Sequence, residues 1–470
     1  SIRTTWGEGR GRSVRRVGDL ELDSELAEVL REHCERLSVP GASAGVLAGG
    51  RLLTASYGVT DVGHPVPVDA DSLFLIGSTT KTLTATAVMT LVQEGRLALD
   101  DRVVDHLPEL VLQDEQARRT VTVGQLLDHT SGWRGDVDQD TGWGDDALQR
   151  AVAEVVPAMP QVFPVGEGAS YSNTAVMVAG RLLEVVTGQR YDQVVRERVL
   201  EPLGMTDTWF FPWEVATRAL ATGHVVRDGV PVPTHGWPIG RGMAPAGGAV
   251  SSVRDQLAYA RFHVDGTCPG APPLADELRL LMQQPRVTLP AALSGIGLSW
   301  LLRDRDGLRM VTHGGNCSNL YVSAFALAPD EGLAVTTLAS SSGGSALGSA
   351  ITEWAVQHHL GRPSVPVRDP LPLTPELAAE YVGRYDAGQW DLDVTAAGGR
   401  LFVQMQLTDI PADTPEDVLA AFDSPPAEHV LLGRDVIGPA GSSESSGDFV
   451  RDPAGRVAWL RQGLRMARRQ

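Results

Sequence analysis

The stretch around which this sequence is organised reads LIGSTTKTLTATAVM and covers residues 75–89. It contains Lys81, the only lysine of the chain, because every other residue among the 40 basic ones is arginine. An arginine guanidinium stays protonated at any working pH, whereas a desolvated lysine amine can lose its proton and act as a base. The exception at position 81 therefore indicates a site that needs a neutral amine.

Ser78 lies three residues before this lysine. Residues i and i+3 share one face of a helix, so the hydroxyl of Ser78 and the amine of Lys81 can meet if the segment is helical. A helix N-terminus also offers unpaired N–H groups to a developing oxyanion. The pattern predicts a serine nucleophile with a lysine base. The alternative is that Ser78 only caps the helix and Lys81 lies in solvent.

The composition predicts a globular protein with two or three domains, since 43% of its 470 residues are hydrophobic and 21% are charged. Its formal net charge of −18 repels phosphate backbones and anionic lipid, so we expect no nucleic-acid partner. No apolar run approaches the ~20 residues that span a bilayer, and no signal peptide is visible. We therefore expect a soluble protein without membrane insertion, with the cytoplasm slightly favoured over export. The sequence leaves the oligomeric state open.

The residue types that most often bind metals or form disulfides show no such pattern. Cys34, Cys268 and Cys317 are an odd set without metal-ligand spacing. His358 and His359 are direct neighbours that point apart on a predicted helix. We therefore expect no metal and no cofactor.

The order of elements predicts four segments. Residues 1–23 form a polar arm, 24–361 a catalytic unit, 362–375 a proline-rich linker and 376–470 an antiparallel β unit. Periodicity predicts helices over 24–37, 78–94, 174–187, 253–263 and 354–360, and strands over 42–48, 51–57, 297–303, 308–312, 320–327 and 333–339. The fold class is α/β (α+β), an antiparallel sheet flanked by helices plus an all-helical region. We expect the β unit to shape or shield the site, or to mediate assembly.

Two other motifs carry weaker functional hypotheses. Residues 41–45, with Ser43 at the centre, match the Gly-x-Ser-x-Gly elbow of α/β-hydrolases. That elbow works only on a turn between a strand and a helix, whereas Ser43 falls within a predicted strand, so this nucleophile is a minor alternative. His129, in the sequence LLDHTSG, is flanked by small polar residues at a helix end. This setting favours a hydrogen-bonded structural role over that of a catalytic base.

Two further motifs place polar groups where a cleft can form. Tyr171 and Asn173 lie in the loop before a predicted buried helix, from which side chains can project into a cleft. His313-Gly314-Gly315 lies at the end of a predicted strand, and its glycines would let a ligand approach the backbone closely. Each motif also has a purely structural interpretation, as a packing tyrosine or a strand-end turn.

In order and broad spacing, these motifs and the Ser78–Lys81 pair resemble the class C β-lactamase and penicillin-binding-protein superfamily. That superfamily includes D-aminopeptidases, esterases and penicillin-binding-protein-type thioesterases. The resemblance covers about residues 25–360, including the phrases LLDHTSG (126–132) and EPLGMTDT (201–208). It implies a β-lactamase-like catalytic domain, and the β unit that follows is similar to the lipocalin-like, barrel-shaped tail of some branches.

The resemblance implies a role for each residue of the first two motifs. Ser78 attacks a carbonyl and forms an acyl-enzyme. A neutral Lys81 or a Tyr171 phenolate takes its proton, and we expect nearby cations or desolvation to depress the pKa values of both groups. Asn173 accepts a hydrogen bond from Lys81 while its amide N–H₂ binds a substrate carbonyl.

The third motif departs from the penicillin-recognising members, which carry Lys-Thr-Gly or Lys-Ser-Gly where this chain has His313-Gly314-Gly315. The resemblance makes His313 a catalytic residue and gives Gly314, Gly315 and Asn316 to substrate binding. The backbone N–H groups of Ser78 and Asn316 would form the oxyanion hole. An imidazole is only partly charged at neutral pH and would hold a substrate carboxylate weakly, which puts β-lactamase and carboxypeptidase activity in doubt.

The resemblance therefore predicts a serine acyl-enzyme hydrolase or acyltransferase acting on a peptide, amide, ester or thioester. Hydrolysis of D-amino-acid-containing peptides and thioesterase or peptide-cyclase chemistry both fit, with a small-molecule, peptidyl or carrier-protein-bound acyl substrate. A carboxylesterase or weak β-lactamase of the same fold is one alternative. A penicillin-binding receptor that is acylated without turnover is the alternative from another class. Whether water or an amine resolves the acyl-enzyme stays open.

Overall fold

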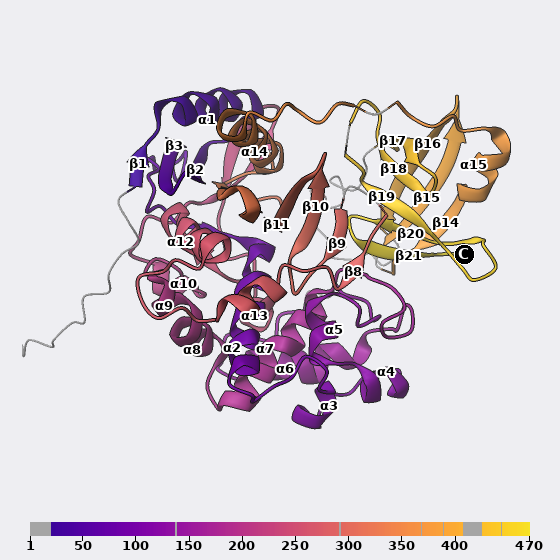
Figure 1. Ribbon diagram of the computed structural model, residues 1–470, viewed down its shortest axis with the longest axis horizontal. Helices are drawn as coiled ribbons and strands as arrows, with labels where there is room; N and C mark the ends of the chain where they lie inside the picture. Colours follow the sequence, from indigo (N-terminus) through magenta and orange to yellow (C-terminus); the bar gives the residue numbers. More distant parts are fainter. Residues whose placement is uncertain are drawn as a thin grey trace, which may run out of the picture.

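The computed structural model describes residues 20–136, 139–290, 293–367, 369–388, 390–407, 425–442 and 444–470. This part forms a sheet-and-helix unit followed by a closed eight-stranded barrel, which confirms the predicted fold class (Figure 1). The predicted N-terminal arm lies outside the described residues except for Leu20–Asp23. There the chain differs from the prediction, because β1 (Leu20–Leu22) pairs in parallel with β3 (Arg51–Gly58) and forms one edge of the sheet.

The large sheet has nine strands among the described residues, in the order β1-β3-β2-β13-β12-β11-β10-β9-β8. Every neighbouring pair except β1 and β3 is antiparallel. The remaining strands are β2 (Gly41–Ala48), β8 (Val287–Thr288), β9 (Leu293–Ile296), β10 (Leu301–Arg305), β11 (Leu308–Cys317), β12 (Tyr321–Ala328) and β13 (Leu333–Ala339). Two separate pairs are β4 (Phe74–Leu75) with β7 (Val250–Ser251) and β5 (Gly223–Arg227) with β6 (Val230–Thr234). Ser43 lies within β2, so the elbow motif forms no nucleophile turn.

Helices cover both faces of this sheet. α1 (Ser24–Leu37) and α14 (Gly344–Leu360) pack together on one face, and α12 (Val253–Asp265) covers the other. α1 begins where the predicted helix begins, because the side chain of Asp23 accepts a hydrogen bond from the backbone N–H of Leu26 and caps the first turn.

α14 begins well before residue 354, where periodicity predicted its start. Gly344 and Gly348 lie in its first turns, against the sheet. A Cβ on either glycine would collide with side chains of β12 or β13, so these positions admit only the smallest residue. Small residues carry no amphipathic signal, which is why the first half of the helix escaped the prediction.

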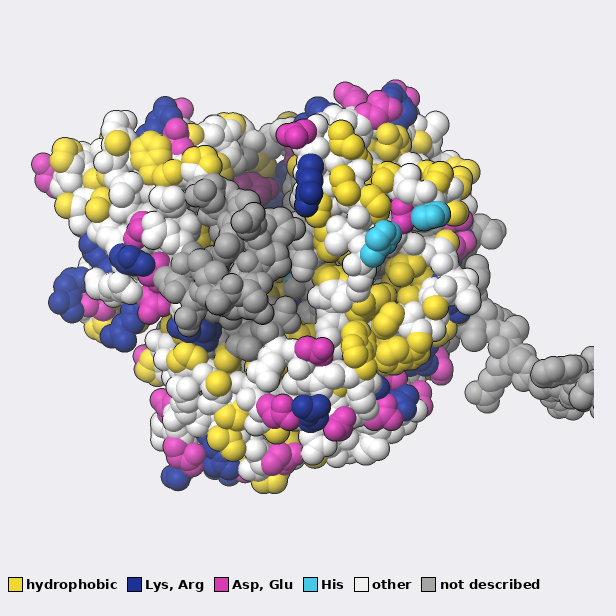
Figure 2. Space-filling view, turned by 180° about the vertical axis from the view of Figure 1, so that it is seen from behind, with side chains coloured by type: hydrophobic (Ala, Val, Ile, Leu, Met, Phe, Trp, Pro, Cys, Tyr) yellow, Lys and Arg dark blue, Asp and Glu magenta, His cyan; other side chains and the backbone are white. Residues whose placement is uncertain are grey.

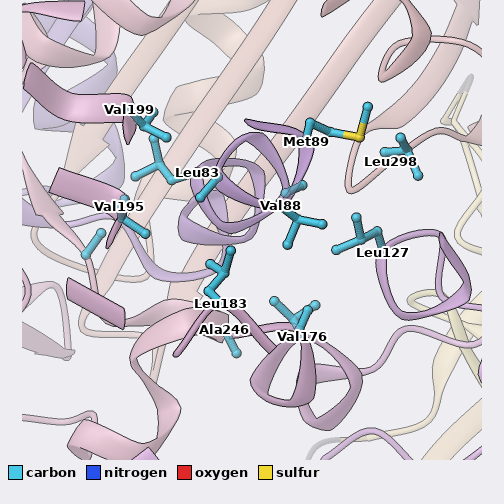
Figure 3. Close-up of a cluster of buried hydrophobic side chains, with 14 of the residues drawn as sticks. Leu83, Val88, Met89, Leu127, Val176, Leu183, Val195, Val199, Ala246 and Leu298 are labelled. Atoms are coloured by element: carbon cyan, nitrogen blue, oxygen red, sulfur yellow. The ribbon is translucent and has the colours of Figure 1, made fainter. Parts of the chain in front are cut away.

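α2 (Thr80–Gln93) is the centre of the helical region. Every residue from Thr80 to Leu91 is buried, so other segments enclose this helix on all sides. Figure 3 shows Leu83, Val88 and Met89 of α2 among hydrophobic side chains of the segments around it. The remaining helices of this unit are α3 (Val103–His106), α4 (Glu115–Thr120), α5 (Val123–Leu127), α6 (Ala147–Arg150), α7 (Asn173–Thr187), α8 (Tyr191–Val195), α9 (Glu201–Leu203), α10 (Pro212–Val215), α11 (Ala244–Gly247) and α13 (Asp276–Leu281).

β11 is longer than the alternation of the sequence indicated. The predicted strand covers 308–312 with His313 at its end, whereas β11 continues to Cys317 and pairs with β12 along residues 311–317. Glycine is depleted in strands, so the two consecutive glycines concealed this extension. The third motif therefore lies inside a strand and not in a strand-end turn.

The C-terminal barrel consists of antiparallel strands. Its elements are α15 (Pro375–Tyr381), β14 (Gly383–Asp386), β15 (Trp390–Ala397), β16 (Arg400–Leu407), β17 (Ala427–Gly433), β18 (Val436–Pro439), β19 (Gly447–Arg451), β20 (Val457–Gln462) and β21 (Arg465–Arg469). The sequence pattern predicts short strands at Tyr385 and over 390–394, 400–405, 428–432 and 457–460, so it missed β18, β19 and β21. These strands are short, and their glycine, proline and arginine residues hide the alternation that a longer strand would show.

The barrel lies beside the sheet edge that β8, β9 and β10 form (Figure 1). Ion pairs of Arg303 and Arg134 are among those that join the barrel to the sheet-and-helix unit. Arg303 of β10 lies 3.6 Å from Glu444, and Arg134 lies 3.9 Å from Asp386 of β14. The contact between the units is therefore partly electrostatic.

The surface of the described residues carries charges of both signs. On the face in Figure 2, acidic and basic side chains are interspersed, and hydrophobic side chains gather in one area. Within the described ranges, no helix combines the length and the apolar character that crossing a bilayer requires.

We expect Gly180→Ala to destabilise the protein although alanine has the higher helix propensity. Gly180 lies in α7, where a Cβ would collide with the ring of Pro245 in α11. Propensity favours alanine by about 1 kcal/mol, whereas overpacking costs about 1–3 kcal/mol, so the net effect is a loss. A urea titration followed by circular dichroism measures the free energy of unfolding.

The control for this prediction is Val185→Ala on the exposed face of the same helix. It should change the free energy of unfolding by no more than about 0.5 kcal/mol. If Gly180→Ala were more stable than the wild type, the close packing of α7 on α11 would be contradicted.

Candidate active site

Ser78 lies in a short 3-10 turn, Gly77–Thr79, that leads directly into α2. The predicted contact is present, because Lys81 Nζ lies 3.0 Å from Ser78 Oγ. Lys81 also donates a hydrogen bond of 2.5 Å to the carbonyl oxygen of Ala246 in α11, a contact that the sequence did not indicate. The lysine side chain is fully buried, so the alternative of a solvated Lys81 is wrong.

The surroundings of Lys81 favour the neutral amine. Burial lowers the pKa of Lys81 well below its ordinary value, Arg465 lowers that pKa further, and Asp136 raises it. A neutral amine has two N–H groups and one lone pair. With one N–H donated to Ala246, the lone pair is available to accept the hydroxyl proton of Ser78.

Tyr171 is the other base that the sequence proposed. Its ring centroid lies 4.9 Å from Lys81 Nζ, and the interaction of its hydroxyl with Ser78 lowers its pKa. Burial raises the pKa of Tyr171 above its ordinary value, and this effect outweighs the lowering by Ser78. The predicted lowering of the Tyr171 pKa is therefore wrong, because burial disfavours the phenolate. The phenol stays protonated, which leaves Lys81 as the candidate base.

Asn173 is the first residue of α7 and not part of the loop before it, because Ser172 is the N-cap. Its Nδ2 donates a hydrogen bond of 2.6 Å to Asp136. Among the described residues, the hydrogen bonds of Lys81 go to Ser78 and Ala246, and not to Asn173 as expected. A carboxylate is the stronger acceptor for the amide, which explains the different arrangement.

Two buried imidazoles lie near Tyr171, with ring centroids 4.5 Å away for His129 and 6.2 Å away for His313. His313 Nδ1 donates a hydrogen bond of 2.7 Å to the carbonyl of Gly314, and burial lowers the pKa of His313 to about 3. His313 is therefore neutral near pH 7, and the expected partial charge is absent. His129 Nδ1 accepts a hydrogen bond of 3.2 Å from the backbone N–H of Ser172, in keeping with the structural role favoured above.

β11 comes close to the Ser78 turn because two glycines leave room for it. A Cβ on Gly315 would collide with the carbonyl oxygen of Ile76. A Cβ on Gly77, whose φ is +50°, would lie 3.0 Å from the backbone nitrogen of Asn316. The backbone of Asn316 thus lies directly beside the turn that carries Ser78.

Two clefts meet at Ser78, and Asn316 lines both of them. The larger has a volume of about 780 Å³ and is bounded by β10 to β12, α14 and the barrel; Tyr171, His313 and Gly314 line it. The smaller has a volume of about 250 Å³. Its lining includes the polar residues Asp136 and Asn173 and the apolar residues Pro238, Ile239, Met243 and Ala246.

The barrel contributes residues that the motifs did not indicate. Leu464 and Arg465, at the turn between β20 and β21, line the larger cleft. Arg465 forms an ion pair with Asp136, 329 residues earlier in the chain, and its guanidinium lies 5.1 Å from the ring centroid of Tyr171. None of these barrel residues belongs to a motif, and a contact across such a separation leaves no local pattern in the sequence.

We expect Lys81→Met to remove a pH dependence of stability that the buried amine causes. The pKa of Lys81 in the folded protein lies below its ordinary value of 10.5, so unfolding takes up a proton at any pH between the two values. The wild type therefore loses stability as the pH falls through this window, and the variant lacks this loss. Urea titrations at about pH 10 and about pH 7 measure the two free energies of unfolding.

The stability of Lys81→Met relative to the wild type should be higher at the lower pH. Comparing the two proteins at each pH cancels the contributions of the other titrating groups. The same difference at both pH values would contradict a lowered pKa of Lys81.

Comparison with known proteins agrees with this geometry. The family model described as Beta-lactamase matches residues 26–358. Penicillin-binding protein 4 of Amycolatopsis lactamdurans is 36% identical over 308 residues, which cover 64% of this chain and 80% of the relative. Unguisins hydrolase ungD' of Aspergillus campestris is 27% identical over 364 residues, which cover 68% of this chain and 62% of the relative.

Among solved structures, SurE matches with a TM-score of 0.73 at 27% identity and covers 95% of this chain and 98% of that one. The structure of SurE with D-Leu matches with a TM-score of 0.70 at 28% identity and covers 95% of this chain and 99% of that one. Because these matches cover 95% of this chain, the structural similarity includes the barrel. The resemblance predicted from the three motifs is thereby confirmed, and the chain belongs to the beta-lactamase family.

Proposed function

We propose that this protein is a serine acyl-enzyme hydrolase or acyltransferase with Ser78 as its nucleophile and Lys81 as its base. The observation that carries the proposal is the fully buried amine of Lys81 at 3.0 Å from Ser78 Oγ. Burying a lysine is costly, and lysines with a strongly lowered pKa cluster at functional sites, where the neutral amine can act as a base. The family of serine hydrolases to which the chain belongs supports this assignment.

In the acylation step, the lone pair of Lys81 takes the hydroxyl proton of Ser78 while Ser78 Oγ bonds to the substrate carbonyl carbon. The carbonyl oxygen becomes an oxyanion and accepts hydrogen bonds from the backbone N–H groups of Ser78 and Asn316. Each such donor stabilises the transition state by about 3 kcal/mol. The close approach of β11 to the Ser78 turn supports this pair of donors.

The tetrahedral intermediate then collapses and releases the leaving nitrogen, oxygen or sulfur, which needs a proton. Tyr171, a protonated phenol whose ring lies 4.9 Å from Lys81 Nζ, gives its proton to the leaving atom and receives the proton held on Lys81. Deacylation repeats these steps with water or an amine as the attacking group. The neutral imidazole of His313 lines the larger cleft and acts as a polar contact and not as a cation.

The substrate we propose is a peptidyl acyl group, in an amide, ester or thioester. The larger cleft, of about 780 Å³, has room for several residues of a chain. The pairing of β10 with β11 ends at Thr312, and from there β11 lines the cleft with its backbone, which suits an extended peptide. The structure of SurE with D-Leu supports a peptide that contains a D-residue, and the relative named as an unguisins hydrolase supports hydrolysis.

A β-lactam substrate is less well supported. Penicillins carry a carboxylate, and the third motif offers the neutral His313 where penicillin-recognising members have lysine. Burial keeps this imidazole uncharged near pH 7, so it supplies no attraction for that carboxylate. This departure favours the esterase, amidase and thioesterase chemistries of the same fold.

A fluorophosphonate probe should label Ser78, and mass spectrometry of the digested protein locates the label. We expect Lys81→Arg to slow labelling by about 10²–10⁴-fold, because a guanidinium keeps its proton. Ser43→Ala is the control and should react at the wild-type rate, since Ser43 lies within β2. Labelling that survives Ser78→Ala would overturn the proposal.

Peptidyl thioesters that end in a D-residue or in its L-epimer test the substrate class. We expect the D-epimer to react at least about tenfold faster, the discrimination that a shaped pocket provides. Mass spectrometry of the products, with and without an added amine, separates hydrolysis, transfer and cyclisation. Equal rates for the two epimers would contradict a site built for D-residues. Stable acylation without release of any product would favour the non-turnover receptor.

A further inference from the structure

The turn between β20 and β21 binds directly to the segment that carries Tyr171. The backbone N–H of Tyr171 donates a hydrogen bond of 2.8 Å to the carbonyl of Leu464. The backbone N–H of Met466 donates a hydrogen bond of 3.1 Å to Ser170 Oγ. The guanidinium of Arg461 donates a hydrogen bond of 3.3 Å to the carbonyl of Ala169. The barrel therefore fixes the backbone on which one of the candidate catalytic side chains is placed.

The carboxylate of Asp136 joins the barrel to the first helical residue of α7. Asp136 Oδ1 accepts hydrogen bonds from Asn173 Nδ2 at 2.6 Å and from Arg465 Nη2 at 3.0 Å. Arg465 Nε donates to the second oxygen, Oδ2. A carboxylate can only accept hydrogen bonds, so it dictates which end of the Asn173 amide faces it. Nδ2 points to Asp136, and Oδ1 points away from it.

The local chain holds Asp136 in this place. At the start of α7, the backbone N–H groups of Asn173 and Thr174 donate hydrogen bonds of 2.9 and 3.0 Å to the carbonyl of Gly135. A Cβ on Gly135 would collide with the carbonyl oxygen of Tyr171, so the segment lies too close for any other residue. The position of Asp136 is therefore tied to α7 on one side and to the Tyr171 segment on the other.

Asp136 and Arg465 also act on Lys81 through their charges, in opposite directions. Arg465 lowers the pKa of Lys81, and Asp136 raises it. The other groups near the amine are the hydroxyl of Ser78, the phenol of Tyr171 and the imidazoles of His129 and His313, all of which are neutral near pH 7. The ion pair thus supplies the net charges that the amine experiences from the described residues around it.

We propose that Asp136 and Arg465 are positioning residues for the reaction of Ser78, and that the barrel is part of the active site. Asp136 orients the amide of Asn173, and Arg465 holds Asp136 in place from the barrel. The inference rests on the proposed function, because it requires Ser78 to be the nucleophile. It adds a pair of residues that no motif indicates.

The test is the rate constant for labelling Ser78 with the fluorophosphonate probe, measured as a function of pH. The rate rises as Lys81 loses its proton, so the position of this rise reports the pKa of Lys81. Arg465→Gln removes a cation that lowers this pKa, so the rise should move to higher pH. Asp136→Asn removes an anion that raises it, so the rise should move to lower pH. Both variants should also react about 10- to 100-fold more slowly on the alkaline plateau, because the Asn173 amide loses its orientation.

The control is Asp386→Asn, which removes an ion pair between the same two units and a charge that is not among those that shift the pKa of Lys81. It should leave both the plateau rate and the position of the rise unchanged. Opposite shifts in the two test variants support the inference, whereas shifts in one direction, no shift or unchanged plateau rates overturn it. If the wild-type protein is not labelled at Ser78, the proposed function fails instead. Circular dichroism at each pH confirms that the variants are folded.

Discussion

The structure depends on one costly arrangement, the burial of a lysine amine against a serine hydroxyl. Transferring a charged ammonium into the interior is strongly unfavourable, so the amine at Lys81 stays neutral. The cost is tolerated because α2 is enclosed on all sides by the helical region, whose packing holds the first turn in place. An arginine could not be neutralised in this position, which gives a physical reason for the single lysine of the chain.

The groups that surround the amine of Lys81 are neutral, or they are charges paired with an opposite charge. Ala246 offers a carbonyl, and burial keeps both the phenol of Tyr171 and the imidazole of His313 uncharged. β11 can reach the Ser78 turn only because Gly77 and Gly315 lack side chains. Under the proposed function, Ser78 would react among groups that are neutral or paired, and the negative charge of the substrate carbonyl would develop in front of backbone N–H groups.

The sequence predicted the contacts that are local and missed those that span the chain. The meeting of Ser78 with Lys81 follows from helix geometry, and the α1 boundary follows from the cap at Asp23. The extension of β11 and the first half of α14 were missed because glycine gives neither an alternating nor an amphipathic signal. The partner of Asn173 and the approach of Arg465 depend on how two units dock. Neither the hydrophobic periodicity nor a motif in either segment indicates how the two units dock.

The docked barrel shifts the pKa of the Lys81 amine without burying an unpaired charge. A lone guanidinium near Tyr171 would pay its full desolvation cost, and a lone carboxylate near Asn173 would do the same. Arg465 and Asp136 form hydrogen bonds with each other, and the lowering of the Lys81 pKa by Arg465 still exceeds the raising by Asp136, so a net effect of the pair on the amine remains. Because one member of the pair comes from each unit, that net effect exists only when the barrel is in place. If Asp136 and Arg465 have the proposed positioning roles, the reaction of Ser78 therefore depends on the docking of the barrel.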